Sequence, residues 1–151
     1  MVYEGFGLKI ELLSPDKRKG VPDGRINIDK LKMASLALRY LNILLDNPIS
    51  ISIRQVGKIS VRSLSAFFIH KLLVAPLRRE VDRKEKDHMQ VNLVAKRILQ
   101  QDDSTSELSR TLGRLPYGWK KRIRASASVM KKILPPSEPD AVLVLLSRVL
   151  V

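Results

Sequence analysis

Residues 49–74 read ISISIRQVGKISVRSLSAFFIHKLLV, and a change of pattern within this stretch decides the fold class. Isoleucine or valine alternates with serine over 49–53 and 59–61, with Gly57 and Lys58 between the two runs. This two-residue period predicts a β-hairpin. After Ser63, apolar residues recur at helical spacing until Pro76, which predicts a helix that Ser63 caps. A strand region therefore gives way to a helical one.

The segment before the hairpin has three patterns. Apolar residues recur mostly at spacing two over 2–13, which predicts a strand weakened by Gly5 and Gly7. Residues 14–25 gather proline, glycine and basic residues, the composition of an exposed loop. Leucine and isoleucine recur every three or four positions over 28–45, which predicts a helix that ends before Pro48.

The segment after the hairpin is predicted to be helical throughout. Beyond the helix that Ser63 opens, we expect one or two helices over 77–100 and further helices at 104–112, 117–134 and 137–151. Ser104 and Glu107 have capping-box spacing, and Ser137 is expected to cap the last helix. The predicted class is α+β, a small N-terminal β element (strand plus hairpin) packed with a predominantly helical C-terminal two-thirds. The 151 residues suit a single domain, with a strand, helix and hairpin region at 1–63 and a helical region at 64–151.

The charge balance indicates an anionic partner. The chain has 28 Lys and Arg against 15 Asp and Glu, a formal net charge of +13. Solubility alone does not require so large a net charge, because small soluble domains carry a net charge of roughly 2 to 8 in magnitude. The excess positive charges repel one another in the folded protein, and binding to a polyanion would offset this repulsion. Nucleic acid is the first candidate and an anionic membrane surface the second.

The most one-sided basic segment is 110–132, with eight basic residues and no acidic one. On a helix, Trp119, Ile123 and Met130 share one face, and most of the cations lie on the other. Such a face contacts phosphates without reading base sequence, and Tyr117 is placed to stack on an unpaired base. The predicted nucleic-acid-binding residues are Arg110, Arg114, Tyr117, Lys120, Lys121, Arg122, Arg124, Lys131 and Lys132, with Lys17, Arg18 and Lys19 of the loop.

The remaining charged and titratable residues favour no active site. Cations and carboxylates alternate over 78–87, and pairs such as Glu80 with Lys84 have the i to i+4 spacing of a solvated helix face. His70 is expected to pack in an apolar helix and His88 to lie on the surface. Neither belongs to a zinc or nucleophile pattern, and the sequence has no phosphate-binding glycine motif. We therefore expect no catalytic residue, no metal, no cofactor and no enzyme.

The sequence also bears on location. It has no cysteine, which fits a reducing compartment. The first 25 residues have no signal-peptide pattern, and the longest apolar run, 141–146, is far shorter than the ~20 residues that span a bilayer. A cytoplasmic or nuclear protein is expected.

These observations predict a non-catalytic protein that binds nucleic acid, RNA or single strands first, in a structural or packaging role. One alternative is a peripheral, self-associating matrix-type scaffold, of the kind found in viruses, whose cations meet anionic lipid. In it, the apolar C-terminal helix mediates insertion or forms a homo-oligomer. The other alternative is an adaptor whose basic helix docks an acidic protein partner.

Overall fold

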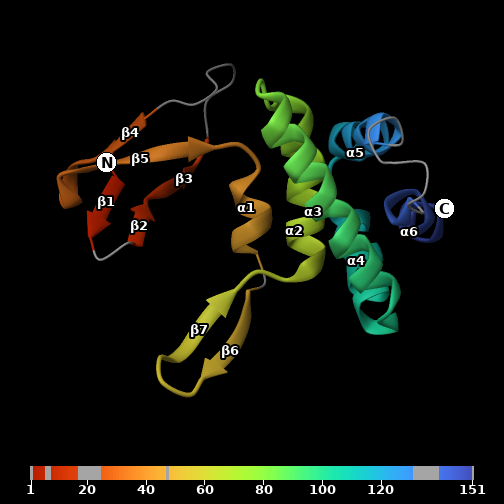
Figure 1. Cartoon of the computed structure of the whole chain (residues 1–151), viewed down its shortest axis with the longest axis horizontal. Coiled ribbons are helices and arrows are strands. Elements are labelled where there is room, and N and C mark those ends of the chain that lie inside the picture. The colour runs from red at the N-terminus through yellow and green to blue at the C-terminus, as the bar shows by residue number, and fades with distance from the viewer. Residues whose placement is uncertain (1, 6–7, 17–24, 47, 131–139, 151) are drawn as a thin grey trace. The chain divides into compact units, whose positions relative to one another are not determined.

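The computed structural model describes residues 2–5, 8–16, 25–46, 48–130 and 140–150 (Figure 1). The chain has two compact units, Met1–Asn42 and Ile43–Val151. Strands dominate the first unit, and the second holds a hairpin followed by helices. The predicted class, α+β with a mostly helical C-terminal part, is confirmed. The expectation of a single domain stays a prediction.

The first unit contains two small sheets. In one, β1 (Val2–Gly5) pairs antiparallel with β2 (Leu8–Glu11). In the other, the central strand β5 (Met33–Leu38) pairs parallel with β3 (Leu13–Pro15) and antiparallel with β4 (Arg25–Ile28). The single strand predicted over 2–13 is therefore wrong, because the chain reverses between β1 and β2.

The helix predicted over 28–45 is also wrong for most of its length. It is replaced by the end of β4, a 3-10 turn η1 (Asp29–Leu31), strand β5 and a short helix α1 (Leu41–Leu45). Strand pairing on both edges of β5 outweighs the helix propensity of its leucines and alanines. Burial within β5 alternates with period two: Ser35 and Ala37 are 1% and 5% exposed, and Leu36 between them is 38% exposed.

The buried hydroxyl of Ser35 shows why a polar residue is tolerated in this strand. It lies 2.6 Å from the Ser14 hydroxyl on β3 and donates to the Ile26 carbonyl on β4 at 3.2 Å. Both neighbouring strands thus satisfy its hydrogen bonds, as a buried polar group requires.

The predicted hairpin is confirmed as β6 (Ile49–Ile53) paired antiparallel with β7 (Gly57–Val61). Its loop has three residues, and the Val56 amide donates to the Ile53 carbonyl at 3.0 Å. Gly57 follows with φ of 91°, the backbone conformation that closes three-residue hairpin loops and that glycine adopts without strain.

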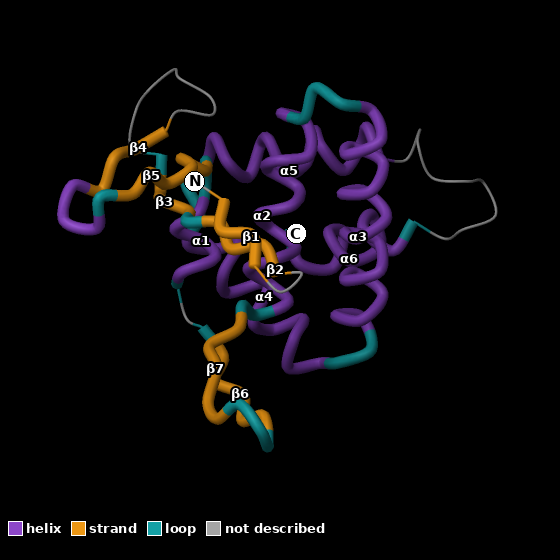
Figure 2. Tube along the Cα trace, turned by 60° about the vertical axis from the view of Figure 1, so that its left-hand side comes forward, coloured by secondary structure: helices purple, strands orange, loops and turns teal. Residues whose placement is uncertain are grey.

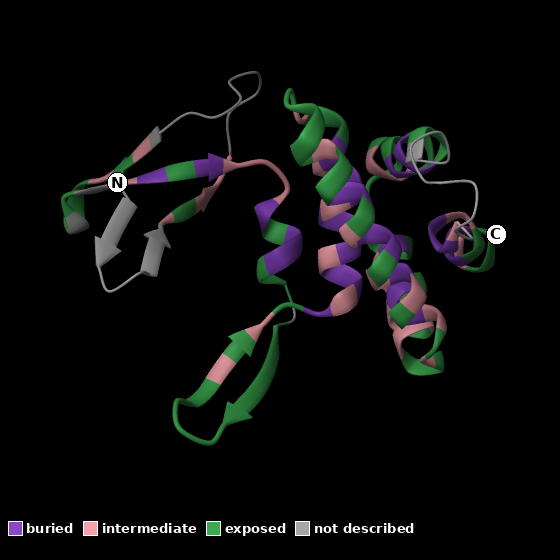
Figure 3. Ribbon diagram, in the orientation of Figure 1, coloured by how far each residue is buried: buried purple, intermediate pink, exposed green. Residues whose placement is uncertain are grey.

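Helix α2 (Leu64–Val74) is the centre of the helical unit. It packs against α3 (Val81–Leu99), α4 (Asp102–Arg114) and α5 (Tyr117–Met130), and a 3-10 turn η2 (Ala75–Leu77) links it to α3. Its residues are apolar on almost every side, which is typical of a buried helix, and Figure 3 shows buried positions around it. Helix α6 (Ala141–Val149) lies beside α3 (Figure 2) and also contacts α4.

The helix starts test the predicted caps. Ser63 caps α2 as predicted, its hydroxyl accepting from the Ala66 amide at 3.2 Å. Helix α4 begins earlier than predicted, at Asp102, so Ser104 lies inside its first turn instead of at the cap. Asp140 caps α6 through the Leu143 amide, whereas the predicted cap Ser137 lies outside the described residues.

Two further helix predictions concern length. The segment 77–100 forms one long helix, α3, after the η2 turn. Helix α5 is described to Met130, and its predicted continuation to 134 falls outside the described part of the chain. Within that described part, no helix has both the length and the apolar character needed to cross a membrane.

Candidate functional site

One buried carboxylate of the helical unit lies between two cations. Asp87 lies on α3, and its side chain is 7% exposed. Lys71 of α2 donates from Nζ to its Oδ1 at 2.5 Å, and Arg78, between η2 and α3, donates from Nε to its Oδ2 at 3.1 Å. These three residues form what we call the Asp87 cluster, which ties α2 to α3.

Electrostatics keep Asp87 ionised. Burial by itself would raise the pKa of its carboxyl, but the hydrogen bonds and charges of Lys71 and Arg78 outweigh burial and hold the pKa below its ordinary value. The cluster therefore carries one carboxylate and two cations, a net charge of +1 at neutral pH. Lys71 also lies 5.4 Å from the centre of the Phe67 ring, on the same helix.

Arg78 keeps part of its hydrogen-bonding capacity. Only its Nε bonds to Asp87, and its terminal nitrogens bond to no acceptor in the described part of the chain. The side chain is 36% exposed. A guanidinium fixed at one nitrogen and open at the others can bind a phosphate or carboxylate through two parallel hydrogen bonds.

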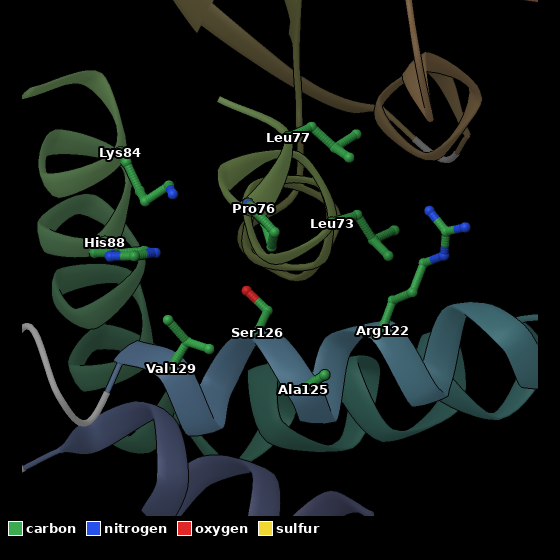
Figure 4. Close-up of a pocket in the computed structure, with 9 residues that line it drawn as sticks. All are labelled: Leu73, Pro76, Leu77, Lys84, His88, Arg122, Ala125, Ser126 and Val129. Carbon is green, nitrogen blue, oxygen red and sulfur yellow. The ribbon is translucent and has the colours of Figure 1, made fainter. Parts of the chain in front are cut away.

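A pocket of about 330 Å³ lies within the same unit (Figure 4). Its polar lining consists of Lys84 and His88 from α3 and Arg122 and Ser126 from α5. The other lining residues come from α2, η2 and α5 and are apolar. Since His88 follows Asp87 on α3, the pocket and the Asp87 cluster share that helix.

His88 is neutral at physiological pH. Burial lowers the pKa of its imidazole, the nearby Lys84 lowers it further, and Asp87 and Glu85 oppose the shift only in part. The residue is 2% exposed, so the predicted surface position is wrong. The charged residues around His88 led to the prediction of a surface position. On α3, however, one side of the helix is buried, and its residues are His88, Val91, Asn92, Ala95 and Ile98.

A pH titration tests the state of His88. Because its folded-state pKa lies below the unfolded value, the neutral imidazole contributes stability above about pH 6.5, and that contribution is lost as the pH falls through the lower folded value. We expect the free energy of unfolding of the wild type to fall as the pH is lowered below about 6.5, and that of His88→Gln to fall less. Urea denaturation at several pH values measures both. Parallel curves for the two proteins would contradict the assignment.

The ion pairs predicted within α3 differ from those found. Glu80 pairs with Arg83, Nε to Oε2 at 2.6 Å, instead of with Lys84. Lys84 lines the pocket. The alternating charges of 78–87 are therefore not only a solvated face, because one carboxylate of the run, Asp87, is buried.

The structure places the predicted nucleic-acid-binding residues on two helices. Arg110 and Arg114 are exposed on α4, and Lys121, Arg122 and Arg124 are exposed on α5, with Lys120 half-buried and Tyr117 78% exposed. We call these residues the basic segment. The remaining predicted residues, Lys17, Arg18, Lys19, Lys131 and Lys132, lie outside the described residues.

Helix α5 has the two faces that its periodicity predicts. Ile123 and Ala127 are buried, 0% and 1% exposed, and pack toward the core of the unit. Tyr117, Lys121 and Arg124 follow each other at i, i+4 and i+7, and all three are exposed. Their spacing therefore places an aromatic ring and two cations on one face.

Some cations of the basic segment bond to the chain itself, and two of these bonds are to backbone carbonyls of known position. Lys120 donates from Nζ to the Gly113 carbonyl at 2.9 Å, and Arg124 donates from Nη2 to the Leu150 carbonyl at 3.2 Å. Both acceptors are neutral carbonyls, so the positive charges remain. Within the described ranges, no carboxylate forms an ion pair with Arg110, Arg114 or Lys121.

The described residues offer no ready metal centre. Among them, no group of three or more His, Asp or Glu side chains is placed to hold a metal ion. What the helical unit brings together is a pair of cations held by a buried carboxylate and, on the same helix, a small pocket. A guanidinium can bind a phosphate, and a concave, mostly apolar pocket with a few polar groups can hold a small molecule.

Comparison with known families identifies the class of enzyme. A sequence profile of a nucleotidyltransferase family matches residues 2–112, and the chain belongs to that family. The matched region runs from β1 to the last turn of α4 and includes the Asp87 cluster. No curated protein and no solved structure matches the chain.

Family membership overturns the predicted function. The sequence was expected to encode a non-catalytic protein with a structural or packaging role and no enzyme; this is wrong, because the family is one of enzymes. The matrix-type scaffold and the adaptor fail for the same reason. The excess positive charge was attributed to nucleic acid, an anionic membrane surface or an acidic protein, although a nucleotide is also a polyanion. A nucleotide or nucleic-acid partner agrees with the family.

The Asp87 cluster was missed for a physical reason. Lys71, Arg78 and Asp87 are separated along the chain and belong to no contiguous motif. Only the packing of α2 against α3 brings them together. One signal was present: Asp87 precedes His88 at the start of the buried stripe of α3, so a carboxylate near the core needed partners.

Proposed function

We propose that this chain transfers a nucleotidyl group from a nucleoside triphosphate to an acceptor. The match to a nucleotidyltransferase family carries the proposal. In this reaction an acceptor oxygen forms a bond to the α-phosphorus and loses its proton to solvent. The bond from that phosphorus to the oxygen bridging to the β-phosphate breaks, and pyrophosphate leaves.

The Asp87 cluster is the proposed contact for the triphosphate. A triphosphate carries several negative charges, and a fixed guanidinium beside a lysine binds such a group without reorganising. Asp87 acts here as a positioning residue, because it orients Lys71 and Arg78 and its own carboxylate would repel phosphate. The net charge of +1 leaves an attraction for the anion.

The proposal does not include a metal centre. Polymerases transfer nucleotidyl groups with two metal ions, which neutralise the attacking and leaving oxygens. The described residues do not fit such a centre, because no acidic or histidine cluster forms among them. Those residues account for nucleotide binding, and the proposal assigns them no metal-dependent step.

Replacing Arg78 by Gln tests the proposed contact. We expect the protein's affinity for nucleoside triphosphate to fall by about tenfold to a hundredfold, since a charge-assisted hydrogen bond contributes roughly 1.5 to 3 kcal/mol. Binding is measured by calorimetry, and transfer by the release of pyrophosphate from triphosphate supplied with RNA, DNA or protein acceptors. Arg79→Gln is the matched control, because Arg79 is the exposed neighbour and makes no contact with Asp87.

The two readouts separate the two parts of the proposal. Equal triphosphate affinity in Arg78→Gln and Arg79→Gln would mean that the Asp87 cluster does not contact the triphosphate. Absence of pyrophosphate release with every acceptor class would count against nucleotidyl transfer itself.

We also propose that the basic segment holds a nucleic acid, either as the acceptor or as a bound partner of the reaction. Three observations support this: exposed cations on α4 and α5, an exposed tyrosine on the same face of α5 as Lys121 and Arg124, and the absence of acidic residues from 110 to 132. Phosphates would meet the cations, and an unpaired base would stack on the Tyr117 ring.

A further inference from the structure

The pocket between α2, η2, α3 and α5 contains two buried polar atoms that lack partners. His88 Nδ1 and Ser126 Oγ form no hydrogen bond with any described residue. Both residues are 2% exposed. A buried polar atom left without a partner is costly, so native proteins pair nearly all of them with protein, water or ligand. Two such atoms lining one pocket indicate an occupant that bonds to both.

The two atoms come from opposite walls. Figure 4 shows the His88 ring extending from α3 toward the pocket and the Ser126 hydroxyl rising from α5 toward the same space. A hydroxyl both donates and accepts, and a neutral imidazole donates at one nitrogen and accepts at the other. The pair therefore suits a neutral polar edge that has donors and acceptors of its own.

Positive charge lines the pocket at two further points. Lys84 extends from α3 and Arg122 from α5, on opposite sides of the pocket (Figure 4). No carboxylate belongs to the described lining. The space between the cations thus favours an anionic group on the ligand.

The other walls are apolar. Leu73, Pro76 and Leu77 line one side, and Ala125 and Val129 line the α5 side. Such walls favour a flat apolar surface, as the two faces of an aromatic heterocycle provide. A volume of about 330 Å³ lies at the small end of ligand sites, which run from about 300 to 1,000 Å³. One small molecule fits there.

We propose that this pocket binds a mononucleotide, with the base between the apolar walls and its polar edge on His88 and Ser126. Arg122 meets the phosphate, and Lys84 adds positive potential from the other side of the pocket. The choice of a nucleotide among heterocyclic anions rests on the proposed function. The site itself goes beyond the family match, because α5 supplies half of its polar lining and lies after residue 112, where the match ends. It makes His88 and Ser126 determinants of base selectivity.

Binding of nucleosides and nucleoside monophosphates to the whole chain tests the proposal. Calorimetry gives the affinity, and amide chemical shifts in NMR spectra give the place of binding. We expect saturable binding of at least one nucleoside monophosphate, with shifts at Ala125, Ser126 and Val129. Its nucleoside is expected to bind more weakly at the same place.

Variants divide the site into its parts. Ser126→Ala is expected to weaken both the nucleoside and the monophosphate about tenfold. Arg122→Gln is expected to weaken the monophosphate by a similar factor and to leave the nucleoside unchanged. Ala125→Leu, which fills the space with a larger apolar side chain, is expected to abolish binding of both.

Matched controls lie on the two helices that supply the polar lining. Ser128→Ala removes an exposed hydroxyl of α5 that bonds to the Arg124 carbonyl, and Lys86→Gln removes an exposed cation of α3 that does not line the pocket. Neither is expected to change binding. Thermal unfolding confirms that each variant folds.

Three results would overturn the proposal: no saturable binding of any mononucleotide, shifts confined to residues outside the pocket, or equal affinity in wild type and Ala125→Leu. Each is independent of transfer activity. If the protein binds mononucleotides in this pocket but releases no pyrophosphate, the proposed site stands and the proposed transfer function is contradicted.

Discussion

Replacement of Asp87 by Asn is expected to lower the free energy of unfolding by about 2 kcal/mol at neutral pH. The carboxylate is 7% exposed, and Lys71 and Arg78 both bond to it. Removing one member of a fully buried ion pair costs roughly 3 to 5 kcal/mol, because the remaining charge stays buried without a partner. The cost is smaller here, since the two cations are 17% and 36% exposed and water screens them.

The pH dependence separates this charge effect from a packing effect. The folded-state pKa of Asp87 lies below the unfolded value, so its carboxylate stabilises the fold above about pH 4, and that contribution is lost as the pH falls through the folded value. The difference in unfolding free energy between wild type and Asp87→Asn is therefore expected to be full at neutral pH and to disappear in strong acid. Urea denaturation over this range measures it.

Asp82→Asn supplies the matched control for the same change of charge. Asp82 lies on α3 as well, but it is exposed. We expect its replacement to alter the free energy of unfolding by less than about 0.5 kcal/mol, as is usual for surface substitutions. Equal losses in the two variants, or a loss in Asp87→Asn that persists in acid, would contradict the buried ion-pair assignment.

The sequence predicts those elements whose pattern is local. The alternation around Ile51 and Ile59 specifies the β6–β7 hairpin, and the apolar run after Ser63 specifies α2 together with its cap. The two faces of α5 also follow from periodicity alone, as the burial of Ile123 shows. In each case neighbouring residues supply the deciding interactions.

The sequence fails where distant residues decide. Residues 33–38 have the leucines and alanines of a helix, yet they form a central strand because β3 and β4 offer hydrogen bonds on both edges. The Asp87 cluster and the pocket depend in the same way on how α2, α3 and α5 pack. No periodicity in α3 reveals that Lys71 from another helix reaches Asp87, so the candidate site could not be assembled from the sequence.

The basic segment carries the prediction with the largest expected effect on the binding of RNA. Replacing Arg114, Lys121 and Arg124 together by Gln is expected to flatten the dependence of single-stranded RNA affinity on salt. Each phosphate contact contributes about 0.7 to the slope of log affinity against log salt for single strands, so three lost contacts change the slope by about 2. At about 0.1 M salt this corresponds to roughly a hundredfold loss of affinity. Fluorescence anisotropy over a salt series measures both quantities.

The control is a triple variant that changes the net charge by the same amount at a different surface. Arg54, Lys58 and Arg62 are exposed in and next to the β6–β7 hairpin, and their replacement by Gln removes three charges as well. If net charge alone attracted RNA, the two triples would weaken binding equally. We expect the hairpin triple to retain nearly the wild-type slope, because contact with phosphate, and not distant attraction, releases counterions. Identical slopes in both triples would mean that the basic segment is not the surface that binds RNA.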